Sequence, residues 1–222
     1  MAINLKNTND VHVNGVKLLV FGMAGTGKTT LIKTLPKPIV LSAEAGLLSI
    51  AGTGIPYIEI ESMSDLKEAY GWLMEHLSEY ETVCLDSISE IAEVVLSSEK
   101  KVAKDPRQAY GAMQDAMGDL IRAFRDLQGV NVYFSAKAEK TQDEVGRLLY
   151  SPSMPGNKTG QALPYFFDEV LALRIENDSE GNPQRALQCQ PDSIWTAKDR
   201  SGRLDFWEVP DLGAVIAKIK GE

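Results

Sequence analysis

Short apolar runs alternate with amphipathic stretches along most of this chain. Residues 16–21 (VKLLVF) form a nearly continuous apolar run, which is typical of a strand buried on both faces of a sheet. Because helical spacing separates such runs, the pattern indicates an α/β fold with a mainly parallel central sheet flanked by helices. The further predicted strands are 38–44, 82–86, 130–136 and 168–176.

The stretches between these strands have apolar residues at the spacing of helices. The first predicted helix ends before Pro36, and the second opens with Ser64 as its expected N-cap. Toward the C-terminus, the turn at 180–183 separates two strands and predicts an antiparallel hairpin at one edge of the sheet. The predicted helices are 29–35, 64–77, 88–103, 107–128 and 211–220.

Composition and charge narrow the classes of function. The 222 residues suit a single domain, and the two cysteines, Cys84 and Cys189, are too few for a disulfide scaffold. We therefore expect a reducing, cytoplasmic setting. We also expect no signal peptide and no membrane span. The net charge of −8 argues against a monomer that coats nucleic acid, but not against basic loops aligned in an oligomer.

Residues 22–29 (GMAGTGKT) match the phosphate-binding pattern G-x-x-x-x-G-K-[ST] at every fixed position. Glycines let the backbone curl until several N–H groups point at phosphate oxygens, and the following helix directs its positive end at the same anion. In such a loop Lys28 reaches the β- and γ-phosphates, and the Thr29 hydroxyl ligates Mg²⁺. The residues predicted to bind ATP with Mg²⁺ are Gly22, Met23, Ala24, Gly25, Thr26, Gly27, Lys28, Thr29 and Thr30.

Carboxylates at the ends of two other strands complete this predicted site. Asp86 ends the strand TVCLD and is expected to hold Mg²⁺ through water, with a role as a helix N-cap as the alternative. Hydrolysis also needs a group that activates water. Many P-loop ATPases have a glutamate where this chain has Ser87, so Glu44 at the end of IVLSAE is the first candidate and Glu90 the second.

The segments GMAGTGKTT, VLSAEAG and VCLDSISEI, in this order, resemble the core of the RecA family. The resemblance implies one RecA-like P-loop ATPase domain with a nucleotide-binding core at 16–176, a preceding segment at 1–15, and an edge hairpin and helix at 177–222. The chain is most similar to short, core-only ATP-binding proteins of phages. Some of these proteins promote annealing and recombination of single-stranded DNA. For a phage protein, the expected location is the cytoplasm of the host cell.

The stretch SIWTAKDRSGRLDF at 193–206 resembles the late-strand Lys-x-Arg of RecA-like hexameric helicases such as DnaB. In that family these cations reach the γ-phosphate of the neighbouring subunit, which implies this role for Lys198 and Arg200 in a ring or filament. Alternating residues of a strand share a face, so the two side chains are expected to point the same way. The alternative is a solvated strand end.

In RecA proteins, DNA-binding loops follow the third and fourth strands, and the corresponding stretches here are 99–111 and 136–161. The second stretch is long enough to be mobile or ordered by a ligand, and Tyr150 is a candidate for stacking on a base. Acidic residues lie in the same stretch, so an ordinary surface loop is the alternative. The implied partners are single-stranded DNA, further copies of the chain and a single-strand-binding protein. The candidates for DNA phosphate contacts are Lys137, Lys140, Arg147 and Lys158.

Two observations leave other functions open. The strand VYFSAKAEK lacks the glutamine that senses the γ-phosphate in RecA, so Ser135 or Lys137 would have to serve instead. A small-molecule or nucleoside kinase would share the P-loop, although such kinases usually carry several arginines in a lid and 136–161 has only Arg147. A nucleotide-regulated interaction module with negligible turnover would fit the serine at position 87.

Overall fold

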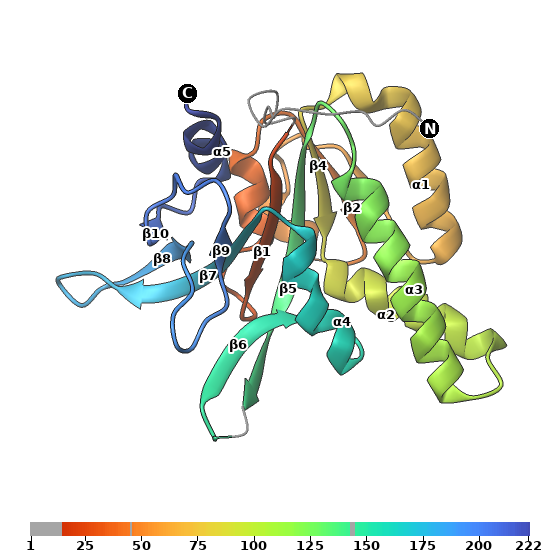
Figure 1. Ribbon diagram of the computed structural model, residues 1–222. Coiled ribbons are helices and arrows are strands. Elements are labelled where there is room, and N and C mark those ends of the chain that lie inside the picture. The colour runs from red at the N-terminus through yellow and green to blue at the C-terminus, as the bar shows by residue number, and fades with distance from the viewer. Residues whose placement is uncertain (1–14, 45, 143–144) are drawn as a thin grey trace, which may run out of the picture.

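The computed structural model of the chain describes residues 15–44, 46–142 and 145–222, without the side chains of 157–159. The predicted segment 1–15 lies outside this description except for Gly15. In the described part, the strands form one ten-stranded, mainly parallel sheet with helices on both faces, so the predicted fold class is confirmed (Figure 1). None of the described helices is both long and apolar enough to cross a membrane.

The strand that leads into the phosphate loop lies inside the sheet. The strands are β1 (Lys17–Gly22), β2 (Pro38–Ser42), β3 (Tyr57–Glu59), β4 (Thr82–Asp86), β5 (Asn131–Gln142), β6 (Leu148–Ser153), β7 (Glu169–Asn177), β8 (Pro183–Gln188), β9 (Lys198–Asp199) and β10 (Trp207–Glu208). Their order is β10-β8-β7-β1-β5-β4-β2-β3, with β6 paired to β5 and β9 to β7. Strand β1 runs parallel to both neighbours and is fully buried, which agrees with its apolar sequence.

The antiparallel part of the sheet begins at β7. Strand β8 returns beside β7, with Leu173 opposite Leu187, and β10 pairs with β8 at the edge. This confirms the antiparallel hairpin that the turn at 180–183 predicted.

The segment after the fourth predicted strand is more ordered than the sequence indicated. Strand β5 continues to Gln142 and forms an antiparallel hairpin with β6, in which Lys137 pairs with Ser153 and Gln142 with Leu148. Much of the stretch 136–161 is therefore a paired hairpin, which the sequence did not predict, and its expected mobility or ordering by a ligand stays a prediction. Much of this ribbon faces solvent, so no buried apolar pattern marks its strands in the sequence.

Helices cover the two faces of the sheet. The α-helices are α1 (Met63–His76), α2 (Ile88–Val102), α3 (Pro106–Arg125), α4 (Asn157–Ala162) and α5 (Leu212–Lys220). The predicted helix after the phosphate loop is a 3₁₀ helix, η2 (Thr29–Thr34). The N-cap of α1 is Ser62, which accepts a hydrogen bond from the Asp65 amide, and the predicted cap, Ser64, lies inside the helix instead.

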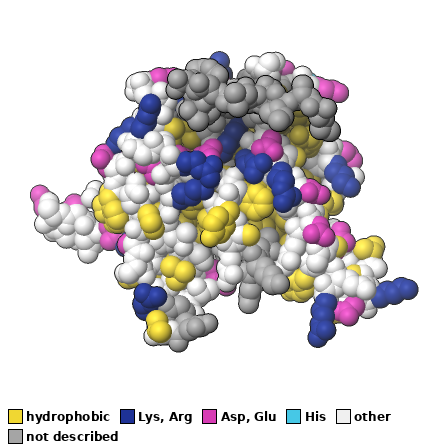
Figure 2. Space-filling view, in the orientation of Figure 1, with side chains coloured by type: hydrophobic (Ala, Val, Ile, Leu, Met, Phe, Trp, Pro, Cys, Tyr) yellow, Lys and Arg dark blue, Asp and Glu magenta, His cyan; other side chains and the backbone are white. Residues whose placement is uncertain are grey.

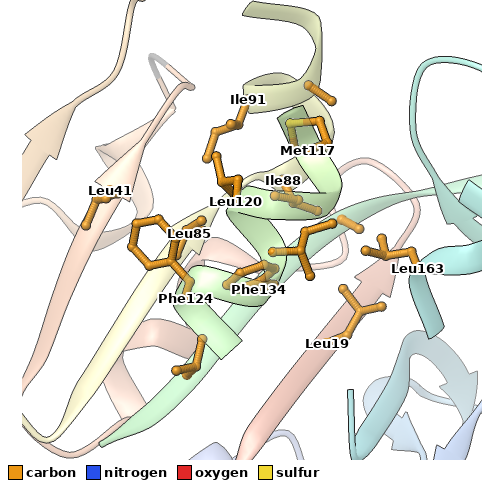
Figure 3. Packing of buried hydrophobic residues seen from close by; sticks show 14 of the residues in the cluster. Leu19, Leu41, Leu85, Ile88, Ile91, Met117, Leu120, Phe124, Phe134 and Leu163 are labelled. Carbon is orange, nitrogen blue, oxygen red and sulfur yellow. The ribbon is translucent and has the colours of Figure 1, made fainter. Parts of the chain in front are cut away.

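Two hydrophobic clusters hold the layers together. One face of the sheet, formed by β1, β2, β4 and β5, is covered by α1, α2 and α3. Figure 3 shows Leu120 and Phe124 of α3 beside Leu85 and Phe134 of the sheet. On the other face, η2 and α5 pack against alternate residues of the same strands. The functional edge of the sheet is therefore carried by strands that are anchored on both sides.

Candidate nucleotide-binding site

The phosphate loop lines a cavity of about 550 Å³ at the carboxyl end of β1. Residues from four separate parts of the chain meet there, as expected for the ends of parallel strands. They are Gly22, Met23, Ala24, Gly25, Gly27, Lys28, Thr29, Thr30, Glu44, Ser49, Lys137, Ala138 and Arg185. All of the predicted nucleotide-binding residues line this cavity except Thr26, whose side chain is buried and donates to the Met23 carbonyl at 2.9 Å.

The glycines of the loop are needed by its geometry. Gly25 and Gly27 have positive φ angles of 78° and 102°, which residues with a Cβ rarely adopt. A Cβ at Gly22 would lie 2.6 Å from the Leu173 carbonyl oxygen, so strand β7 leaves no room for one. The loop is further anchored by the buried Tyr133, whose hydroxyl donates to the Lys28 carbonyl at 2.8 Å.

The Lys28 side chain folds back over the loop. Its ammonium donates to the carbonyls of Gly22 at 2.9 Å and Met23 at 3.1 Å. Burial lowers the pKa of Lys28, while the nearby Glu44 and Asp86 carboxylates oppose this. When an anion enters the cavity, the Lys28 ammonium can exchange these two neutral acceptors for a charged one. Hydrogen bonds to a charged acceptor are stronger, so the exchange favours the binding of phosphate.

The Asp86 carboxyl group is buried at the end of β4, where Oδ1 accepts a hydrogen bond from Ser135. Among the residues that the structure describes, Oδ2 has no hydrogen-bond partner. Burial raises the pKa of Asp86, and the hydrogen bond from Ser135 and the nearby Thr29 hydroxyl counteract this. A buried carboxylate oxygen without a partner, beside a threonine hydroxyl, fits the outer ligand set that Mg²⁺ with a nucleotide requires. The described residues contain no cluster of three or more metal-ligating side chains, so a metal would depend on the nucleotide for its other ligands.

Glu44 lines the cavity from just beyond the end of β2. Its Oε1 accepts a hydrogen bond from the Ser87 hydroxyl at 2.6 Å, and its carbonyl accepts one from Ser42 at 2.9 Å. The Ala43 amide donates to the Asp86 carbonyl at 3.1 Å, so the ends of β2 and β4 are joined. The Asp86–Ser87 peptide bond is cis. The serine that replaces the usual glutamate thus holds the candidate base, Glu44, beside the phosphate loop.

The structure places Lys137 in this cavity, away from the tip of the β5–β6 hairpin. It lies opposite Gly22 in the parallel pairing of β1 and β5, and its ammonium forms an ion pair with Glu90. Lys137 thus lines the nucleotide cavity, and its predicted contact with DNA stays a prediction. The carboxylate of Glu90, the second candidate base, takes part in this ion pair.

Lys198 and Arg200 do not line the cavity of their own chain. The Lys198 ammonium donates to the carbonyls of Pro164 at 3.3 Å and Phe167 at 2.6 Å. The Arg200 guanidinium donates to Asp168 at 2.5 Å, and both side chains of this pair are largely exposed. The two cations thus contact the same segment, although strand β9 ends at Asp199 and Arg200 lies just beyond it.

Lys140 and Arg147 are exposed on the β5–β6 hairpin, which projects from the body of the molecule (Figure 1). The side chain of Lys158 lies outside the described part of the chain. One face of the Tyr150 ring is stacked on Trp195, at 4.3 Å between centroids, so base stacking on that face is excluded. Basic and acidic side chains are interspersed over the visible face (Figure 2), so the local field is mixed.

The sequence analysis missed three residues that line this cavity, Ser49, Ala138 and Arg185, of which only Arg185 is charged. It lies on β8, and its Nε donates to the Thr26 carbonyl at 2.6 Å across 159 residues of sequence. The sequence pattern located the hairpin but carried no signal for its register, so no residue of β8 could be assigned to the loop.

The chain was compared with solved structures, curated proteins and models of protein families. Among solved structures, the chain is similar to a KaiC-like protein from the hyperthermophilic archaeon Pyrococcus horikoshii OT3. The two share 14% identity with a TM-score of 0.45, over 78% of this chain and 77% of that one. Among curated proteins, none matches the chain. Residues 14–201 match the model of the AAA_24 family, described as an AAA domain, and this chain therefore belongs to that family of P-loop proteins.

Proposed function

We propose that this chain binds and hydrolyses ATP with Mg²⁺ and acts on single-stranded DNA, as a RecA-like protein of the short phage type. The observation that carries the proposal is that Lys28 and Glu44 line one cavity, where Ser87 holds Glu44 and the buried Asp86 carboxylate is near enough to act on the pKa of Lys28. Membership of an AAA domain family supports the nucleotide part. The DNA part rests on the RecA resemblance and on the projecting β5–β6 hairpin.

Each group has a chemical task in this proposal. Lys28 and the loop amides bind the phosphates, and Thr29 with Asp86 would hold Mg²⁺, which neutralises charge on the phosphate oxygens. Glu44 accepts a proton from the attacking water, with its carboxylate oriented by the Ser87 hydroxyl. The hydrogen bonds of the loop and the buried strand ends keep these groups fixed before the substrate arrives, which lowers the cost of reorganisation.

For DNA, the proposal uses the β5–β6 hairpin of several copies aligned side by side. Lys140 and Arg147 would contact phosphates there. Because strand β5 also carries Lys137 in the nucleotide cavity, nucleotide binding and the hairpin share one continuous element. Binding of this kind depends on phosphate neutralisation and therefore weakens steeply with salt.

The test is ATP hydrolysis by the purified chain with Mg²⁺, with and without single-stranded DNA, alongside its mass in each nucleotide state. We expect DNA to stimulate turnover and the Glu44→Gln variant to lose about 10²-fold or more, because removing a general base has that effect. Glu79→Gln, at an exposed position remote from the cavity, is the matched control.

Three results would redirect the assignment. Tight ATP binding without turnover would favour a nucleotide-regulated interaction module. Phosphate transfer to a small acceptor would favour a kinase. Turnover that single-stranded DNA leaves unchanged, together with no DNA binding in the presence of ATP, would remove the DNA part of the proposal.

A further inference from the structure

The β7–β8 hairpin extends past the end of β1 and over the phosphate loop. Phe21 of β1 pairs with Ala172 of β7, whereas Arg185 of β8 pairs with Ile175, three residues further along β7. At about 3.3 Å per residue, Arg185 lies roughly 10 Å beyond Phe21 along the strand direction, at the level of the loop. The register of two strand pairs thus brings an arginine of the sheet edge to the nucleotide cavity.

The guanidinium of Arg185 contacts the middle of the loop. Its Nε donates to the Thr26 carbonyl at 2.6 Å, and a Cβ at Gly27 would lie only 3.1 Å from the same Nε atom. Among the described residues, this is the only hydrogen bond of the Arg185 side chain, and none of their carboxylates forms an ion pair with it.

Of the other two cations of the cavity, one has a carboxylate partner and one, like Arg185, has backbone carbonyl partners. Lys137 is paired with Glu90, and Lys28 donates to two backbone carbonyls. Arg185 therefore brings a positive charge to the cavity that no described carboxylate neutralises. Four of the five donor hydrogens of a guanidinium remain after one bond from Nε, in a planar arrangement that matches phosphate oxygens.

We propose that Arg185 is a positioning residue for the nucleotide, binding an oxygen of the α- or β-phosphate while its Nε continues to hold the Thr26 carbonyl. This inference rests on the proposed ATP binding. The loop backbone is the part of a P-loop that cradles the α- and β-phosphates, and Arg185 lies beside that backbone. ATP and ADP share these phosphates, so Arg185 contributes equally to the binding of both.

The test compares four variants by titration calorimetry with MgATP and with MgADP. A charge-assisted hydrogen bond predicts about 10- to 100-fold weaker binding of both nucleotides by Arg185→Ala. Arg185→Lys keeps the charge and is expected to retain most of the affinity, whereas Arg185→Gln keeps a donor without the charge and is expected to bind as weakly as Arg185→Ala. Gln184→Ala is the matched control, because the adjacent side chain of β8 points to the opposite face of the sheet.

The calorimetry can contradict the proposed contact between Arg185 and the nucleotide in several ways. Wild-type affinity in Arg185→Ala, or full affinity in Arg185→Gln, would overturn the inference, the latter because loop shape alone would then explain the contact with Thr26. A loss of ATP binding without a loss of ADP binding would overturn the assignment to the α- and β-phosphates. If the wild-type chain binds neither nucleotide, the proposed function itself fails, which is distinct from a wild-type chain that binds ATP independently of Arg185.

Discussion

At the scale of single residues, the site depends on how one hydroxyl is used. Ser87 is the N-cap of α2, accepting a hydrogen bond from the Glu90 amide at 3.4 Å, and it also donates to Glu44 at 2.6 Å. The shorter bond goes to a charged acceptor and is the stronger of the two. Ser87 therefore links a structural role at a helix terminus to the orientation of the candidate base.

The Ser87→Ala variant separates these two roles. We expect ATP turnover to fall about 10-fold with nearly unchanged nucleotide affinity, because Glu44 loses the donor that orients it but the phosphate loop keeps its contacts. The loss of the cap should lower the free energy of unfolding by about 1 kcal/mol. Steady-state kinetics and urea denaturation measure the two effects.

Ser62→Ala is the control for this variant, because Ser62 caps α1 in the same way and has no contact with the site. It should lose similar stability and no activity. Equal turnover in both variants would show that the bond between Ser87 and Glu44 has no part in catalysis.

At the scale of elements, a buried carboxyl group joins β7 to the segment that carries Arg200. Glu169 of β7 is buried and accepts a hydrogen bond from the Ser201 amide at 3.1 Å. Burial raises the pKa of Glu169 to about 8, and the neighbouring Asp199 and Asp168 carboxylates add to this. Asp199 in turn accepts hydrogen bonds from Ser201 and from the amides of Gly202 and Leu204.

This raised pKa predicts a pH dependence of stability. Between the unfolded pKa near 4.5 and the folded pKa near 8, the folded chain holds a proton on Glu169 that the unfolded chain has lost. The stabilising contribution is complete below pH 4.5 and is lost as the pH rises toward 8, at roughly 1 kcal/mol per pH unit. Glu169→Gln remains neutral throughout, so its free energy of unfolding should fall less than that of the wild type from pH 5.5 to 7.5.

Urea denaturation at several pH values measures the difference between the two slopes. Asp86, whose pKa is also raised, contributes equally in both proteins and cancels from the comparison. Glu180→Gln, at the exposed β7–β8 turn, serves as the control and should follow the wild type. Parallel slopes for the wild type and Glu169→Gln would show that Glu169 does not carry the proton.

At the scale of the whole molecule, Lys198 of β9 and Arg200, just after it, do not line the nucleotide cavity of their own chain. Arg200 forms an exposed ion pair with Asp168, and such pairs contribute only about 0–1 kcal/mol. The cost of releasing Arg200 to another acceptor is therefore small. A role in catalysis requires a second copy of the chain that places Arg200 against the γ-phosphate of its neighbour.

Mixing of variants tests this trans arrangement. Arg200→Ala should bind ATP normally and hydrolyse it at least 10³-fold more slowly, because an arginine supplied in trans contributes about 10³–10⁵ to the rate. Addition of Glu44→Gln, which lacks the base but keeps Arg200, should restore part of the turnover in mixed assemblies. Hydrolysis rates of the single and mixed proteins, with their masses by light scattering, measure this.

Asp168→Asn is the control for the ion pair, because it releases Arg200 without removing it, and it should retain turnover. Normal turnover by Arg200→Ala, or no recovery on mixing in a protein that does assemble, would contradict a role in trans.

The local sequence was sufficient to predict the phosphate loop and the main strands of the sheet. The residues of the P-loop are adjacent in the chain, and their conformation follows from glycines at positions with positive φ and a helix that begins at Thr29. Asp86 and Glu44 were found because apolar runs end at them, and ends of parallel strands meet at one edge. Burial on both faces made these runs visible in the sequence.

What required the tertiary structure is the pairing of groups that lie far apart in the chain. Arg185 contacts Thr26 although 159 positions of sequence separate them, and Lys137 and Glu90 form an ion pair at a sequence separation of 47. Such contacts depend on strand register and on side-chain direction, and a shift of one residue turns every side chain to the other face. The sequence by itself determined that this chain carries a phosphate-binding loop on a parallel sheet; the tertiary structure decided which distant side chains complete the site, because register and packing are set only when the strands meet.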